Sequence, residues 1–161
     1  MKDILTYLEQ NGRATAAEIA AALGRDEAEV SAIIKKCEED KIILGYKAVV
    51  DWRNTEENRV SAQIEIKIIP QRGDGFARVA ERICAYDEVE SVTLMSGGGY
   101  DLLVRISGKS LEEVAMFVAE KVAPLDCVTS TATLFELKKF KDSGERIGET
   151  IAEDQERLTR L

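Results

Sequence analysis

The chain has 161 residues, of which 45% are hydrophobic and 32% are charged, and its formal net charge is −8. This length and composition indicate a globular protein of one large or two small domains, and they exclude a membrane-spanning helix, since no apolar run approaches ~20 residues. The acidic balance also opposes nucleic-acid binding, which depends on Lys and Arg side chains that contact phosphates.

The residue types argue against an enzyme or a metal site. The chain has no histidine, the commonest general base and transition-metal ligand. Its three cysteines, Cys37, Cys84 and Cys127, are far apart and form no C-x-x-C pair, so neither a zinc site nor a disulfide framework is indicated. We therefore expect no cofactor, no metal and no catalytic residue. Acidic residues interrupt the apolar N-terminal stretch, which is not a secretory signal, and we expect a cytoplasmic protein.

Residues 2–23 predict two helices. The first spans 2–11 and would pack across the helices that follow it. Thr15 with Glu18 matches a capping box, in which the hydroxyl accepts from a first-turn N–H and the carboxylate reaches back. Gly24 can supply the left-handed residue that ends this second helix.

A third helix begins at Asp26, where Glu29 repeats the capping pattern, and runs to Asp40. Two short helices joined by a tight turn that contains glycine are typical of a helix-turn-helix, whose second helix enters the DNA major groove. A plain helical hairpin in a globular core has the same spacing, so both interpretations remain open at this point. Ile33 should be exposed on this helix if its neighbour Ile34 is buried.

The segment after the third helix changes character twice. Residues 42–50 are apolar and rich in β-forming types, which predicts a strand that serves as a wing. Residues 51–59 are polar and predict a linker. Trp52, the only tryptophan, is expected to anchor the chain beside the domain junction.

Residues 60–140 alternate strands and helices in a recognisable order. The strands are expected at 60–69, 89–95, 100–106 and 128–140, and the helices at 74–86 and between Ser110 and Pro124. Strand, helix, strand, strand, helix, strand is the ferredoxin-like arrangement, an antiparallel sheet with both helices on one face. Its open face must be covered, most simply by a second copy of the chain.

The last 21 residues predict a C-terminal amphipathic helix over 141–161, whose thin apolar stripe suits packing on a dimer or a partner. The whole chain is thus expected to have an α+β fold with four parts. These are a three-helix helix-turn-helix domain (1–50), a linker (51–59), a ferredoxin-like βαββαβ sensing domain (60–140) and a C-terminal helical extension (141–161).

Four motifs resemble the Lrp/AsnC (leucine-responsive/asparagine-synthase regulator) family of transcription factors. They are GR at 12–13, EIAAALG at 18–24, the helix at 27–40 and the ending I-x-G-Y-x-A at 43–48. The family carries a ferredoxin-like domain second, so the resemblance covers about residues 2–140 in the same domain order. It implies a homodimeric or larger transcriptional regulator that binds DNA and responds to a small-molecule effector, by analogy an amino acid. The chain departs from the family in having Ile33 where Arg or Lys is usual and Lys41 where Gly is usual.

The candidate DNA contacts follow from the helix-turn-helix interpretation. They are Arg25, Ser31, Lys35 and Lys36. The two lysines are expected to meet phosphates, which positions the protein but does not specify sequence. Acidic residues at 26, 27 and 29 suit the helix dipole but oppose the duplex. A solvated lysine face is the alternative.

The loop at 96–101, Ser-Gly-Gly-Gly-Tyr-Asp, is the candidate effector site. Its glycines permit positive φ and leave N–H groups free to meet a carboxylate or phosphate. It resembles the family's G-x-Y-D signature, whose neighbourhood binds amino-acid effectors and is bordered by the last strand. The candidate effector contacts are Gly98, Gly99, Tyr100, Asp101, Thr131 and Thr133. A flexible turn and a structural threonine stripe are the alternatives, and Asp101 could hold a ligand ammonium or tie down its own turn.

Two other functions remain open. Sirohaem decarboxylases resemble the same family in both domains, but they favour histidine near the tetrapyrrole and this chain has none. A protein-interaction module with a degenerate helix-turn-helix would instead use the acidic surface and an exposed Ile33.

Overall fold

The computed structural model describes residues 1–69 and 75–148. The chain divides into two compact units, Met1–Val50 and Asp51–Leu161, and each is described by itself. Among the residues described, no helix is long and apolar enough to cross a membrane.

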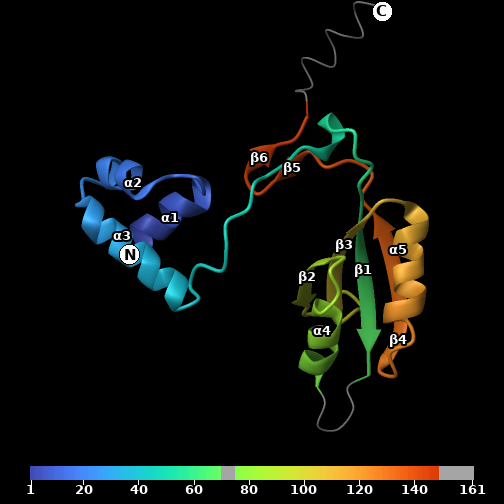
Figure 1. Cartoon of the computed structure of the whole chain (residues 1–161). Helices are drawn as coiled ribbons and strands as arrows, with labels where there is room; N and C mark the ends of the chain where they lie inside the picture. The colour runs from blue at the N-terminus through green and yellow to red at the C-terminus, as the bar shows by residue number, and fades with distance from the viewer. Residues whose placement is uncertain (70–74, 149–161) are drawn as a thin grey trace, which may run out of the picture. The chain divides into compact units, whose positions relative to one another are not determined.

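The first unit contains three helices, α1 (Lys2–Gln10), α2 (Ala16–Leu23) and α3 (Glu27–Glu39) (Figure 1). Each helix buries one apolar face against the other two. The buried core residues are Ile4, Leu8, Ile19, Ala20 and Val30. The predicted three-helix unit is therefore confirmed.

Local caps fix the start of α2 and the turn between α2 and α3. Thr15 and Glu18 form the full capping box: the Glu18 amide donates to Thr15 Oγ1 at 3.2 Å, and the Thr15 amide donates to Glu18 Oε2 at 2.7 Å. Gly24 ends α2 with φ of 63°, in the left-handed region. Asp26 caps α3 by accepting from the Glu29 amide at 3.1 Å. The turn is short because these two caps are only two residues apart.

Residues 42–50, which follow α3, form no strand, in contrast to the prediction. The Lys41 amide donates to Glu38 O at 3.2 Å and the Ile42 amide to Cys37 O at 2.8 Å, the paired bonds of a Schellman motif. The β-forming residues beyond it have no neighbouring strand among the described residues to pair with. A β-rich sequence without a partner does not form a ladder, so the predicted wing is wrong.

We expect Lys41→Gly to stabilise the first unit by roughly 0.5–1 kcal/mol. Lys41 holds φ at 57°, a left-handed conformation that costs an L side chain energy and costs glycine little. Thermal unfolding followed by circular dichroism measures the change. Lys47→Gly, in the extended segment beyond, is the control, and equal or lower stability of Lys41→Gly than wild type would contradict this reading of the cap.

The second unit contains one four-stranded antiparallel sheet and two helices on one of its faces (Figure 1). Its elements are β1 (Val60–Ile68), α4 (Phe76–Cys84), β2 (Val89–Leu94), β3 (Leu102–Gly108), α5 (Leu111–Phe117) with a π-helical turn η2 (Val118–Val122), and β4 (Val128–Phe135). The strand order is β2-β3-β1-β4. This is the predicted ferredoxin-like arrangement, so the α+β fold class is confirmed.

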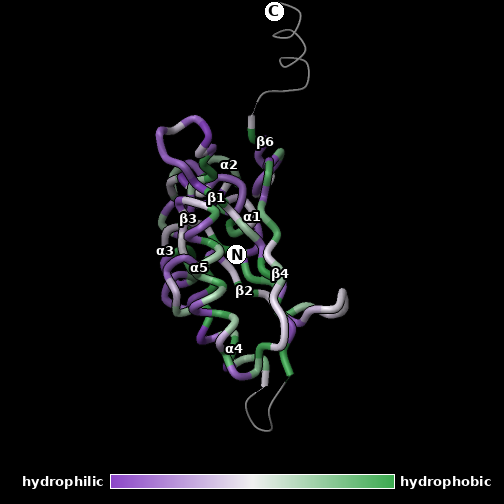
Figure 2. Tube along the Cα trace, turned by 90° about the vertical axis from the view of Figure 1, so that its right-hand side faces the viewer, coloured by the Kyte–Doolittle hydropathy of each residue, from purple (hydrophilic) through white to green (hydrophobic). Residues whose placement is uncertain are grey.

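Alternation along β1 separates the two faces of the sheet. Ala62, Ile64, Ile66 and Ile68 are all buried against the helix layer, while the residues between them lie on the open face. The helices show the matching alternation of hydrophobic and hydrophilic residues along α4 and α5 (Figure 2). The core of this unit therefore lies between one face of the sheet and the two helices.

The chain after β4 also differs from the prediction. The last strand ends at Phe135, five residues earlier than expected, and β5 (Lys141–Asp142) pairs with β6 (Glu145–Arg146) in a hairpin. Its turn residues Ser143 and Gly144 have φ of 46° and 90°, as a two-residue hairpin turn requires. The predicted helix over 141–161 is therefore wrong for 141–146, and its part over 149–161 lies outside the described residues. A short 3-10 helix, η1 (Trp52–Asn54), lies beside this hairpin (Figure 1).

Candidate DNA-contact and effector sites

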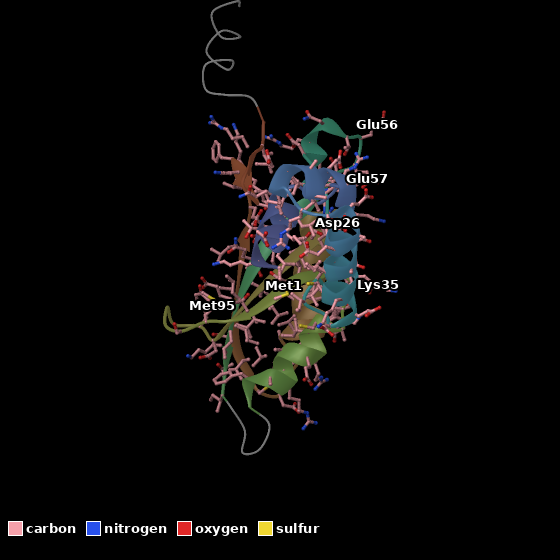
Figure 3. All side chains as sticks on the ribbon, turned by 90° about the vertical axis from the view of Figure 1, so that its left-hand side faces the viewer. Met1, Asp26, Lys35, Glu56, Glu57 and Met95 are labelled. Carbon is pink, nitrogen blue, oxygen red and sulfur yellow. The ribbon has the colours of Figure 1, made fainter. Side chains whose placement is uncertain are left out.

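The outer face of α3 carries the residues that the helix-turn-helix interpretation selects. Figure 3 shows Asp26 at the start of α3 and Lys35 further along, projecting away from the helix. Ser31, Lys35 and Lys36 are all exposed, and Lys35 pairs with Glu39 at 3.9 Å, one turn on. An exposed i,i+4 pair of this length contributes only a few tenths of a kcal/mol, so Lys35 can exchange Glu39 for a phosphate.

Arg25 lies between two carboxylates at the entry to α3. Its Nε is 3.2 Å from Asp3 Oδ2 of α1, and its Nη1 is 3.3 Å from Glu29 Oε1. The Arg25 side chain is 29% exposed. Glu29 therefore does not complete a capping box with Asp26; it neutralises the candidate arginine instead. For Arg25 to contact a phosphate it must exchange at least one of these partners.

We expect Glu29→Gln to tighten DNA binding about five-fold at low salt, because it removes an anion beside the duplex and releases Arg25. Fluorescence anisotropy with labelled operator DNA measures the dissociation constant. Glu9→Gln on α1 makes the same change of net charge and should have a much smaller effect. Weaker binding by the Glu29 variant would show that Glu29 positions Arg25 productively.

Ile33 and Ile34 are both half-buried, so the condition under which Ile33 was expected to be exposed, a buried Ile34, is not met. Both Ile33 and Ile34 pack against the core of the first unit. The helix therefore turns a wider apolar face inward than the spacing of Val30, Ile34 and Cys37 indicated. This placement leaves only part of the Ile33 side chain accessible to a partner.

The glycine-rich loop joins β2 to β3. Gly97, Gly98 and Gly99 have φ of 96°, 86° and 86°, all in the region that favours glycine. A Cβ on Gly98 would also lie 3.3 Å from Cε1 of Tyr100, so this position has little room for a side chain. The glycines thus give a tightly curved loop with exposed backbone.

Asp101 ties this loop to the end of β1. Its Oδ2 accepts from the Ile68 amide at 2.8 Å, its Oδ1 lies 3.1 Å from Lys67 Nζ, and its own amide donates to Ile66 O at 2.9 Å. The hydrogen bond from the Ile68 amide, helped by Lys67, holds the pKa of Asp101 below its ordinary value of 3.8. The stabilisation by this carboxylate is therefore present above about pH 4 and is lost as the pH falls through the lowered pKa.

Thr131 and Thr133 lie on β4, opposite Ile66 and Ile64, and so on the helix face of the sheet. Both are half-buried. Thr131 shares a cross-strand row with Leu102 at the start of β3, about 10 Å away across two strand spacings. The structure thus brings Thr131 to the loop end of the sheet and leaves Thr133 one row further from it.

Sequence reasoning assigned Lys67 to the polar face of its strand and Thr129 to a threonine stripe, and selected neither as a site residue. Lys67 pairs with Asp101, and Thr129 Oγ1 donates to Lys67 O at 3.2 Å. Thr129 sits at an irregularity where the β1–β4 register shifts between Lys67 and Ile68. Alternation alone assigns Lys67 to solvent, and only the register of three strands places it beside Asp101. Among the described residues, no three acidic, cysteine or histidine side chains gather as a metal site.

Comparison with known proteins adds family relationships to this geometry. A family profile described as the Lrp/AsnC ligand binding domain matches residues 61–146, and a winged helix-turn-helix DNA-binding profile matches residues 1–43. The HTH-type transcriptional regulator YugG of Bacillus subtilis is 47% identical over 154 residues, which cover 95% of this chain and 92% of YugG.

Solved structures share the fold. A transcriptional regulator from Neisseria meningitidis in complex with L-Met has a TM-score of 0.67 at 23% identity, covering 87% of this chain and 89% of that one. A feast or famine regulatory protein from Mycobacterium tuberculosis, complexed with L-methionine, has a TM-score of 0.72 at 20% identity, covering 91% and 96%. Relatives in sequence are named as transcriptional regulators rather than enzymes, so the decarboxylase alternative has no support.

Proposed function

Because the chain belongs to the Lrp/AsnC family of DNA-binding transcriptional regulators, we propose that its second unit senses an amino acid and thereby controls DNA binding by the first. The observation that supports this most is the glycine-rich loop tied by Asp101 to the end of β1. Exposed backbone amides of such a loop suit a carboxylate, and the Asp101 carboxylate suits an ammonium group. Thr131 lies on the helix face of the neighbouring strand, where its hydroxyl suits another polar group of the effector. The two solved relatives bound to L-methionine support an amino acid as the class of effector.

The DNA contacts in this proposal are Arg25, Ser31, Lys35 and Lys36. The lysines and Arg25 meet phosphates, and Ser31 lies on the exposed side of α3, where it can reach a base edge. Their contribution has to exceed the repulsion from Asp26, Glu27 and Glu29 at the start of the same helix.

The regulator acts as a homodimer or a larger homo-oligomer. The open face of the sheet presents half-buried Leu103 on β3 and exposed Leu134 on β4, with the helices on the other face. An open sheet face is most simply covered by a second copy, and a dimer presents two recognition helices to two half-sites. Sedimentation equilibrium measures the association, and a monomer at micromolar concentration would contradict this part.

Effector control of DNA binding has a thermodynamic signature. If an amino acid changes operator affinity, operator DNA must change amino-acid affinity by the same factor. Calorimetric titration of methionine, leucine and other amino acids into free and operator-bound protein measures both affinities. Binding with equal affinity in the two states would contradict the coupling and leave DNA binding untouched.

We expect Asp101→Asn to weaken effector binding by roughly ten-fold, because the amide cannot pair with both the Ile68 amide and a cation. Titration calorimetry with the tightest-binding amino acid checks this. Glu112→Gln, the same change of charge on the exposed surface of α5, is the control and should bind as wild type does. An unchanged affinity in the Asp101 variant would move the effector away from this loop.

A further inference from the structure

A row of alternating charges crosses the open face of the sheet at the end where the linker enters β1 and the chain leaves β4. We call it the ion ladder. Its members, in spatial order, are Arg59, Glu90, Arg105, Glu136, Lys139 and Asp142. Cations and anions alternate along it, and its formal charge is zero.

The first half of the ladder holds the linker. Arg59 Nη2 lies 3.0 Å from Glu90 Oε1 and donates to Ser107 Oγ at 2.9 Å. Its guanidinium carbon also lies 4.8 Å from the centre of the Trp52 ring, in cation–π geometry. Glu90 is held from the other side by Arg105, whose Nε lies 3.7 Å from Glu90 Oε2. Glu90 therefore attaches the linker residue Arg59 to the sheet.

The second half holds the C-terminal hairpin. Arg105 forms a close ion pair with Glu136, which is only 17% exposed and also accepts from Gln63 of β1. Lys139 Nζ lies 3.5 Å from Glu136 Oε2 and 2.9 Å from Asp142 Oδ2, and so connects the two carboxylates. Its hydrogen bond holds the pKa of Asp142 below the ordinary value. Arg105 is thus the one cation shared by the two halves.

The two held segments also meet each other. A Cβ placed on Gly148, just after the hairpin, would lie 2.5 Å from Arg53 Nη2 in the linker. Arg53 is itself paired with Asp51 at 2.8 Å. The linker and the hairpin therefore close into one assembly whose ionic attachment to the sheet is the ladder.

We propose that the ion ladder is a clasp that fastens the linker to the ligand-binding domain. The paired strands β1 and β3 run from the Asp101 loop to the ladder, and through them the effector state of the domain reaches the linker that leads to the DNA-binding unit. The clasp is local geometry; its regulatory role rests on the proposed function. Opening the clasp at Glu90 removes the ion pair of Arg59 and leaves only its hydrogen bond to Ser107, which loosens Arg59 and Trp52. The core is not disturbed, since Glu90 lies on the surface of an edge strand.

Trp52 reports on the clasp directly, because it is the only tryptophan. It is 37% exposed, so full release predicts a roughly two- to three-fold rise in its acrylamide quenching constant in Glu90→Gln. In wild-type protein 1 M NaCl, where the screening length is about 3 Å, should shift quenching in the same direction. Glu88→Gln, which breaks the Glu88–Lys121 pair two residues away, is the matched control and should leave quenching unchanged. Unchanged quenching in Glu90→Gln, or an equal rise in both variants, would overturn the clasp.

The regulatory part has its own readout in the same full-length variant. Glu90→Gln should bind the effector amino acid and the operator separately as wild type does, while the factor by which effector changes operator affinity falls towards one. An unchanged factor together with released Trp52 would overturn signal transmission through the ladder. If wild-type protein binds no operator or no amino acid, the proposed function fails, and the Trp52 measurement still decides the clasp.

Discussion

Replacing both lysines, Lys35→Ala together with Lys36→Ala, is expected to weaken operator binding roughly 50-fold near 0.1 M salt. Each phosphate contact releases about one counterion, so loss of two contacts reduces the slope of log K against log salt by about 1.8 and affinity accordingly. Both side chains are exposed, and Lys35 is 77% exposed, so their loss leaves the fold of the first unit unchanged. Anisotropy titrations at several salt concentrations give both the affinity and the slope.

The matched control for this variant is Lys2→Ala with Lys47→Ala. It removes the same charge from positions outside α3. A general electrostatic attraction would weaken equally in both double variants. Equal loss of affinity in the two double variants would contradict the placement of the DNA contacts on α3. Lys35 and Lys36 would then be solvent-exposed lysines without a specific role.

Truncating Ile66 to alanine is expected to destabilise the second unit by about 3–4 kcal/mol, the largest stability effect foreseen here. Ile66 is fully buried in the second half of β1, where it pairs with Leu102 on one side and Thr131 on the other. Alanine leaves a cavity beneath both helices. The unfolding midpoint in urea should fall by about 2 M, given the slope typical of a domain of this size.

Urea unfolding followed by Trp52 fluorescence measures this effect, because Trp52 belongs to the second unit. Gln63→Ala, on the open face of the same strand, is the control and should cost well under 1 kcal/mol. A loss of similar size in the control would show that β1 depends on its open face as much as on the helix layer.

Local signals account for the parts of the fold that could be predicted. The capping residues Thr15, Gly24 and Asp26 act within four positions of themselves, so the sequence there already contains the geometry. The strict alternation of apolar and polar residues in β1 likewise identifies its buried face, whichever strands lie beside it.

The errors occurred where a segment's structure depends on distant partners. Residues 42–50 look β-forming, but no described strand lies beside them, and the Schellman motif at Lys41 takes up the nearest amides. The hairpin at 141–146 follows from the two positive φ values of Ser143 and Gly144, which a helical periodicity count does not register.

The candidate sites divide in the same way. The exposure of Lys35 and Lys36 follows from helical spacing, whereas the pairing of Arg25 with Asp3 requires α1 to lie across the start of α3. Asp101 was selected by sequence, but its bond to the Ile68 amide and its pair with Lys67 depend on strand register. Cross-strand ion pairs such as those of the ladder have no signature in spacing along the chain.

The most direct test of a DNA-binding α3 in so acidic a protein is fluorescence anisotropy on the DNA upstream of its own gene. The titration is made at two salt concentrations and against a scrambled duplex of the same length. We predict tighter binding to the upstream DNA than to the scrambled one, with affinity that falls as salt rises. Failure to bind at low salt, with and without a panel of amino acids, would contradict this assignment of DNA contacts to α3.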